Sequence, residues 1–171
     1  MRRWLLGLVL AATCSGCMFT SGVGEPLHSM DDEPVGPRHE FGPVPRFTDE
    51  GREDGHLVVF FETRDGWCLE SSQGGSCAGG DIGLPTEGFQ GVSGSEGGDG
   101  TCMETIAAHD VVELRVETGD GRWVTLPPLA GGDAAPVQVF AACWSRGVRF
   151  DQLSVEARGA DGEVIGTYDA G

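Results

Sequence analysis

The fold is constrained most by a recurring unit in which an Asp-Gly turn separates two apolar, β-rich runs. The turns lie at Asp65-Gly66, Asp120-Gly121 and Asp161-Gly162. Glycine adopts positive φ without steric cost, so Asp-Gly between such runs is a strong signal for a β-hairpin. No stretch of the chain shows a convincing helical period. We therefore predict an all-β domain.

The runs beside these turns predict about seven short strands. Leu114 and Val116 alternate with Glu113 and Arg115, as in an antiparallel strand with one buried face. About seven strands over residues 56–171 suit an antiparallel immunoglobulin-like β-sandwich, with a partly open barrel as the alternative. The strands are expected within residues 56–63, 67–70, 111–117, 122–126, 137–144, 153–157 and 164–168, and residues 101–106 are a further candidate for a short strand.

Two segments lack this pattern. Residues 17–55 hold five prolines and many acids without a sustained apolar period, so burial cannot offset their ordering entropy. We predict a disordered acidic, Pro-rich tether over 17–55. Residues 72–100 contain 11 glycines in 29 positions. We predict a Gly-rich loop there, which is either a disordered insertion or the place of function.

The N-terminus has the composition of an export signal. Arg2 and Arg3 precede a nine-residue apolar run, which is too short to cross a bilayer, since that requires about 20 residues. Ser15-Gly16-Cys17 resembles a bacterial lipobox, with Cys14 in the position usually held by Leu. The resemblance implies a lipoprotein-type signal peptide over 1–16 and lipidation of Cys17 on the extracytoplasmic side of the cell membrane. The alternative is ordinary cleavage near Gly16, which gives a secreted protein.

The cysteine count fits export and lipidation. Of six cysteines, four remain once Cys14 is removed and Cys17 is lipidated, and four can pair. In an exported protein such a set predicts disulfides, and no close C-x2-C pair indicates a metal site. Three pairings are possible; the favoured one closes a short Gly-rich loop and ties two strands across the long loop. The expected disulfides are Cys68–Cys77 and Cys102–Cys143.

Charge and composition exclude several classes of function. All 27 acidic residues follow Cys17 with nine arginines, so the exported part has a formal charge of −18. Such a chain repels phosphate backbones, and we expect no nucleic-acid binding. The chain has no lysine, which excludes Schiff-base and phosphate-loop chemistry. The histidines are scattered, and neither Ser76 nor Ser93 completes a G-x-S-x-G motif. We expect no catalytic residues, cofactor or metal.

Several short motifs lie along the chain from about His56 onward. They are Gly66-Trp67-Cys68-Leu69-Glu70 before a Gly-rich stretch, the 111–126 hairpin, Phe140-Ala141-Ala142 and Ala160-Asp161-Gly162-Glu163-Val164-Ile165-Gly166. Together they resemble a group of uncharacterised exported proteins of actinobacteria with a small all-β domain. The resemblance implies no particular activity.

Two functions from different classes fit these features. The leading hypothesis is a lipid-anchored, non-enzymatic binding or envelope-interaction module that meets an envelope protein. Trp144 and Arg146 are the candidate contact residues, because Trp144 lies out of phase with Val139 and Cys143, and an exposed Trp beside Arg suits a protein contact. The alternative is a secreted inhibitor that presents the Cys68–Cys77 loop to a protease.

Overall fold

The computed structural model describes residues 33–171, except 80–82, 98–99, 146 and 171. The signal peptide, Cys17, the first half of the expected tether and Arg146 lie outside the described residues. Thirteen strands and one 3-10 turn, η1 (Phe150–Gln152), make up the regular structure of this part of the chain. The strands form three sheets.

The two outer sheets each have four strands. The first outer sheet has the order β1-β4-β5-β6, and the second has the order β10-β9-β12-β13. Each contains predicted hairpins: β4–β5 turns at Asp65-Gly66, and β9–β10 and β12–β13 turn near Gly121 and Gly162, both at positive φ. The strands are β1 His39–Phe41, β4 Val58–Glu62, β5 Gly66–Ser71, β6 Gly74–Gly79, β9 Glu113–Glu117, β10 Trp123–Leu126, β12 Ser154–Arg158 and β13 Val164–Asp169.

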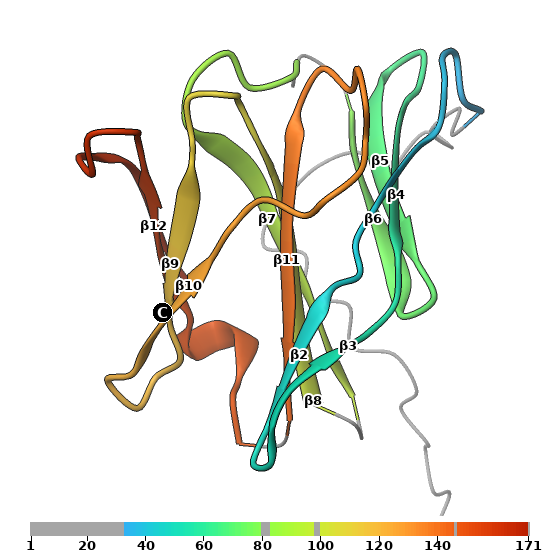
Figure 1. The fold of residues 1–171 in the computed structure, drawn as a ribbon. Helices are drawn as coiled ribbons and strands as arrows, with labels where there is room; N and C mark the ends of the chain where they lie inside the picture. The colour runs from blue at the N-terminus through green and yellow to red at the C-terminus, as the bar shows by residue number, and fades with distance from the viewer. Residues whose placement is uncertain (1–32, 80–82, 98–99, 146, 171) are drawn as a thin grey trace, which may run out of the picture.

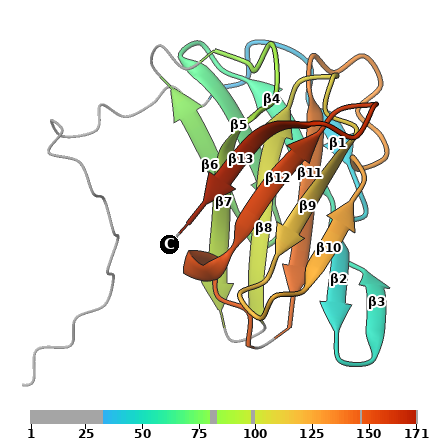
Figure 2. The ribbon, with the colours of Figure 1, turned by 90° about the vertical axis from the view of Figure 1, so that its left-hand side faces the viewer.

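The middle sheet has five strands in the order β3-β2-β11-β8-β7. Of the strand pairs that the structure describes, β2–β11 alone is parallel. Figure 1 shows the layers nearly edge-on, with β9, β10 and β12 on the left, β11 and β8 in the centre and β4–β6 on the right. Figure 2 shows the second outer sheet face-on. The middle strands are β2 Pro45–Thr48, β3 Gly51–Asp54, β7 Phe89–Gly97, β8 Gly100–Ala107 and β11 Gln138–Trp144.

A hydrophobic core lies on each side of the middle sheet. Along β11, Val139 and Ala141 belong to the first core, against Phe60 and Leu69 of the first outer sheet. Phe140, Ala142 and Trp144 belong to the second core, against the second outer sheet. Side chains alternate across a strand, so a strand that is apolar at every position is buried on both faces.

The all-β class and the sandwich-like packing of antiparallel sheets are confirmed, whereas the immunoglobulin-like arrangement is not. That arrangement has two sheets around one core. Here a third sheet adds a second core, and residues 39–54 supply three of the thirteen strands.

The predicted tether is wrong for residues 39–54, which form β1, β2 and β3. Phe41 and Val44 are buried in the first core, and Phe47 packs against the second. Pro45 is the first residue of β2, a position where the missing N–H is tolerated. The few apolar residues of this segment, spaced between prolines and acids, are enough to order it, because they fit into cores that are built by strands distant in the sequence.

The predicted long loop is also wrong, since residues 74–79 and 89–97 form β6 and β7. Glycine weakens a strand, but it permits close approach of other groups. A Cβ atom at Gly91 would lie 2.7 Å from the Trp67 ring, and one at Gly94 would lie 2.1 Å from Phe150. These glycines are therefore required by packing against aromatic side chains.

Candidate functional site

A polar hollow opens between the first outer sheet and the middle sheet, and we call it the Glu104 hollow. It has a volume of about 120 Å³, and its walls include the Cys102–Cys143 disulfide, His56 and the β5–β6 turn. Its polar centre is formed by Ser76 of β6, Ser93 of β7 and Glu104 of β8.

Strand register brings these three side chains together. Ser93 and Glu104 are directly paired across β7 and β8. Glu104 lies on the same face of β8 as Ile106, which belongs to the first core, so alternation directs the carboxyl group toward β6. Ser76 is paired with Leu69, another residue of the first core. Both sheets thus direct a polar side chain into the gap at the rim of the core.

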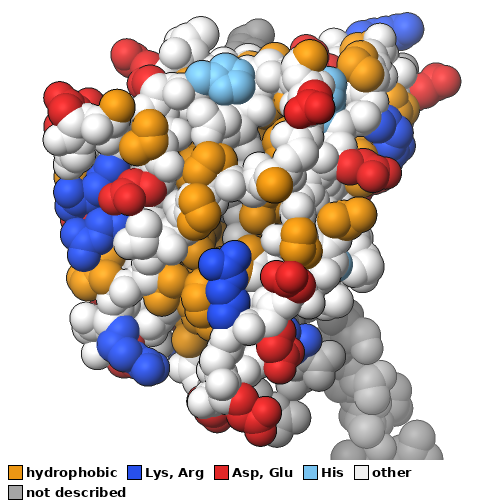
Figure 3. Space-filling model, in the orientation of Figure 1, with side chains coloured by type: hydrophobic (Ala, Val, Ile, Leu, Met, Phe, Trp, Pro, Cys, Tyr) orange, Lys and Arg blue, Asp and Glu red, His pale blue; other side chains and the backbone are white. Residues whose placement is uncertain are grey.

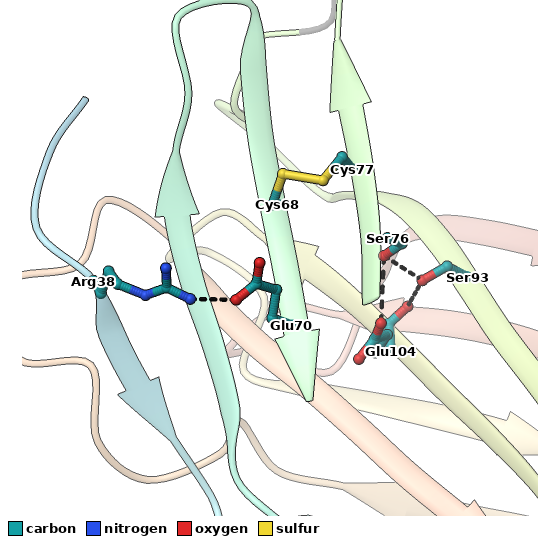
Figure 4. Close-up of a disulfide and its surroundings, with 7 residues drawn as sticks. All are labelled: Arg38, Cys68, Glu70, Ser76, Cys77, Ser93 and Glu104. Atoms are coloured by element: carbon teal, nitrogen blue, oxygen red, sulfur yellow. Dashed lines mark hydrogen bonds and ion pairs between the residues drawn. A yellow bond between two sulfur atoms is a disulfide. The ribbon is translucent and has the colours of Figure 1, made fainter. Parts of the chain in front are cut away.

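A small hydrogen-bond network links the three residues (Figure 4). The Ser76 and Ser93 Oγ atoms are 2.9 Å apart, and Ser76 Oγ donates to Glu104 Oε1 at 3.3 Å. Ser93 Oγ lies 3.4 Å from the Glu104 backbone oxygen. Ser76 thus holds the carboxyl group directly, and Ser93 supports it through Ser76 and through the Glu104 backbone.

Burial dominates the electrostatics of Glu104. Loss of hydration raises the pKa of this half-buried carboxyl group to about 7, although the Ser76 hydrogen bond opposes the shift. The group therefore changes charge around neutral pH. Carboxyl groups in clefts with a strongly shifted pKa are candidates for functional sites, since most carboxyl groups are solvated and fully ionised at neutral pH.

A second hollow of about 250 Å³ continues from the first. The two share His56, Gln73 and the Cys102–Cys143 disulfide, and the second adds Arg46 and Glu96. Burial and the nearby Arg46 charge lower the pKa of His56. The described charged groups around the hollows are therefore Glu104, His56, Arg46 and Glu96.

Both predicted disulfides are present and have structural roles. Each joins directly paired residues: Cys68–Cys77 links β5 to β6, and Cys102–Cys143 links β8 to β11. The first fixes β6 next to Ser76, and the second forms part of the wall of the Glu104 hollow. Two disulfides are typical of proteins in an oxidising, extracytoplasmic compartment.

The predicted exposure of Trp144 is wrong. Its side chain is 4% exposed and stacks on Phe47, with ring centroids 6.1 Å apart. Trp144 does lie on the opposite face of β11 from Val139 and Cys143, but the second outer sheet covers that face. Its predicted partner Arg146 lies outside the described residues.

The residues of the hollow were missed as a group in the sequence. Ser76 and Ser93 were considered only as hydrolase nucleophiles, and Glu104 was one of many acids. The available signal was phase: in the 101–106 strand, Glu104 shares its face with Cys102 and Ile106, so an acid falls on the core-facing side.

Exposed His109 lies beside Gln138 and does not line the Glu104 hollow. Among the described residues, no group of three or more His, Cys, Asp or Glu side chains is placed to hold a metal ion.

The part of the chain that the structure describes also contains no helix with the length and apolarity to span a membrane. No protein-family model, curated protein or solved structure matches this chain.

Proposed function

We propose that the protein is a lipid-anchored, non-enzymatic binding module on the extracytoplasmic side of the cell membrane. In this proposal the Glu104 hollow receives the ammonium group of a small ligand or of a partner's side chain. The lipobox-like Ser15-Gly16-Cys17 supports the anchor, and the two disulfides agree with the compartment.

The proposal rests on the half-buried carboxyl group of Glu104 beside two hydroxyl groups. An ammonium ion has three donors, and the carboxylate and serine oxygens are acceptors. A charge-assisted hydrogen bond would offset the dehydration that disfavours the ionised carboxylate. The formal charge of −18 on the exported part also attracts cations.

The Cys68–Cys77 inhibitor alternative has less support. The residues between the two cysteines belong to the β5–β6 hairpin, in which Cys68 and Cys77 face each other. A protease inhibitor presents an extended loop, whereas this segment has its backbone engaged in a ladder.

Calorimetry with small amines tests the proposed binding site. Ethylamine and ethanolamine should bind the intact protein more tightly at pH 8 than at pH 6, because a group of pKa about 7 is roughly one-tenth ionised at pH 6 and about nine-tenths at pH 8. Neutral ethylene glycol should not bind in this way. Glu104→Gln should abolish the amine binding, and Glu62→Gln, on the exposed end of β4, is the matched control. Equal binding by Glu104→Gln would refute the site.

The anchor has its own test. Cys17→Ala should move the protein from the membrane fraction to the medium, because a two-chain lipid holds a protein at the membrane through roughly 0.8 kcal/mol per buried CH₂. Fractionation and immunoblotting measure the shift. Retention of the variant in the membrane would contradict the anchor without bearing on the Glu104 hollow.

A further inference from the structure

A third hollow, larger than the two beside Glu104, lies on the other side of the middle sheet, between the β2–β3 hairpin and the β9–β10 hairpin. Its volume is about 590 Å³, within the range of small-molecule sites. Figure 3 shows hydrophobic side chains grouped in the depression between these two sides, with charged side chains around it. We call it the aromatic groove, because Phe47, Trp123 and Trp144 line it.

The aromatic side chains are fixed in place. Phe47 and Trp144 stack with an interplanar angle of 19°. Trp123, on β10, is 40% exposed, and the Arg115 guanidinium lies 4.9 Å from the centroid of its ring. Flat, preordered aromatic surfaces bind the apolar faces of ligands and lose little conformational entropy on binding.

One residue of this groove carries an unpaired donor. Trp144 Nε1 is buried and has no hydrogen-bond partner among the described residues. Buried indole N–H groups usually have a partner, because water no longer satisfies them. Trp67 Nε1 is buried and unpaired too, but Trp67 belongs to the first core and does not line this groove. Trp144 lines both the aromatic groove and the 250 Å³ hollow, so an acceptor could approach it from either side.

Among the described residues of the lining, the charges balance, although the protein is strongly acidic. The lining contains Asp49, Asp120, Arg52 and Arg122, and Asp120 forms an ion pair with Arg122. Thr48 and Thr118 add hydroxyl groups. A lining with equal numbers of both signs, mixed with hydroxyls, matches an uncharged ligand that both donates and accepts hydrogen bonds.

We propose that the aromatic groove binds a linear, uncharged glycan. One sugar ring packs its C–H face on the aromatic lining, and a sugar oxygen accepts a hydrogen bond from Trp144 Nε1. Hydroxyl groups on neighbouring rings contact the balanced Asp and Arg side chains. This site is separate from the Glu104 hollow, so it stands or fails independently of the proposed amine binding.

Binding of two tetrasaccharides tests the inference, with glucose or N-acetylglucosamine units in β1,4 linkage. Titration of the intact protein, followed by calorimetry and tryptophan fluorescence, should give saturable binding to at least one of them below about 10 mM. Trp144→Phe keeps a ring and removes the donor, so binding should weaken about fivefold. Trp123→Ala changes an exposed residue, and it should weaken binding by a similar factor or more.

Matched controls decide the location. Trp67→Phe makes the same change at the other unpaired indole and should leave glycan affinity within about twofold of the original. Glu104→Gln should also leave it unchanged. The inference is overturned if neither tetrasaccharide saturates, or if Trp144→Phe and Trp123→Ala bind like the unmodified protein. The inference is also overturned if Glu104→Gln loses glycan binding. It is likewise overturned if the protein binds an extended Val-Thr peptide and neither glycan.

Discussion

The two faces of the middle sheet carry different kinds of chemistry. The face toward the second outer sheet packs Met103, Phe140 and Ala142 into an apolar core. The face toward the first outer sheet ends in the Glu104 hollow, where a carboxyl group and two hydroxyl groups replace apolar contacts. Both faces pack a hydrophobic core, and the first exchanges some of its stability for a group that titrates near neutral pH.

The largest expected effect comes from the apolar face. Phe140 is fully buried in the second core, and Phe140→Ala should lower the free energy of unfolding by about 3–5 kcal/mol through lost contacts and a cavity. Urea denaturation measures the change. A loss below about 1 kcal/mol would contradict the role of Phe140 in the second core.

The disulfides allow the middle sheet and the first outer sheet to be compared through chain entropy. Replacing Cys102 and Cys143 together by Ala should cost about 4 kcal/mol in the simple chain model, because their sequence separation is 41. The same change at Cys68 and Cys77, with a separation of 9, should cost about 2.6 kcal/mol. Denaturation of both double variants checks the order, and a larger cost for the Cys68–Cys77 pair would contradict it.

The polar face should show a distinctive pH dependence. Because the folded-state pKa of Glu104 is raised to about 7, the folded state binds this proton more tightly than the unfolded state. The contribution is fully present below about pH 4.5 and is lost as the pH rises through 7. The loss is at most about 3 kcal/mol.

Glu104→Gln isolates this contribution, because His56 and the other titrating groups are common to both proteins. The variant should be more stable than the unmodified protein at pH 8, and the difference should shrink toward pH 5. Urea denaturation at several pH values measures it. A difference that is independent of pH would mean that Glu104 titrates normally.

The smallest effect concerns the serine network. Ser76→Ala removes a hydrogen bond that lowers the pKa of Glu104, so this pKa should rise further, while stability changes by about 1 kcal/mol or less. A carboxyl ¹³C NMR titration follows the pKa. Ser71→Ala is the control, because Ser71 Oγ bonds Gly74 and not Glu104. A lowered pKa in Ser76→Ala would contradict the assigned role.

Local pattern in the sequence was sufficient for the hairpins but not for the layers. Alternation and Asp-Gly turns predict β4–β5, β9–β10 and β12–β13, whose partners are close in the chain. The strands β1 and β2 have few apolar residues and pair with β4 and β11, which local patterns do not reveal. The near-continuous apolar run at 137–144 was the one signal for a strand buried on both faces.

The candidate site was harder to predict than the fold. Ser76 and Ser93 lie in Gly-rich sequence that resembles a loop, and they meet Glu104 only because β6 and β7 become ordered. The disulfide pairs were predictable because parity and spacing restrict them. Trp144 was assigned to the correct face, but a third sheet covers that face, and the apolar run at 137–144 was the only sign of that cover in the sequence.

The parallel pairing of β2 with β11 also has a consequence for how the chain is made. Arg46 is paired with Cys143, so a segment synthesised early waits for a partner that is among the last to be translated. The middle layer is therefore completed only when residues up to about 144 of the 171 have been synthesised. The N-terminal strands acquire their final neighbours late, since pairing between segments that are distant in the sequence is slow.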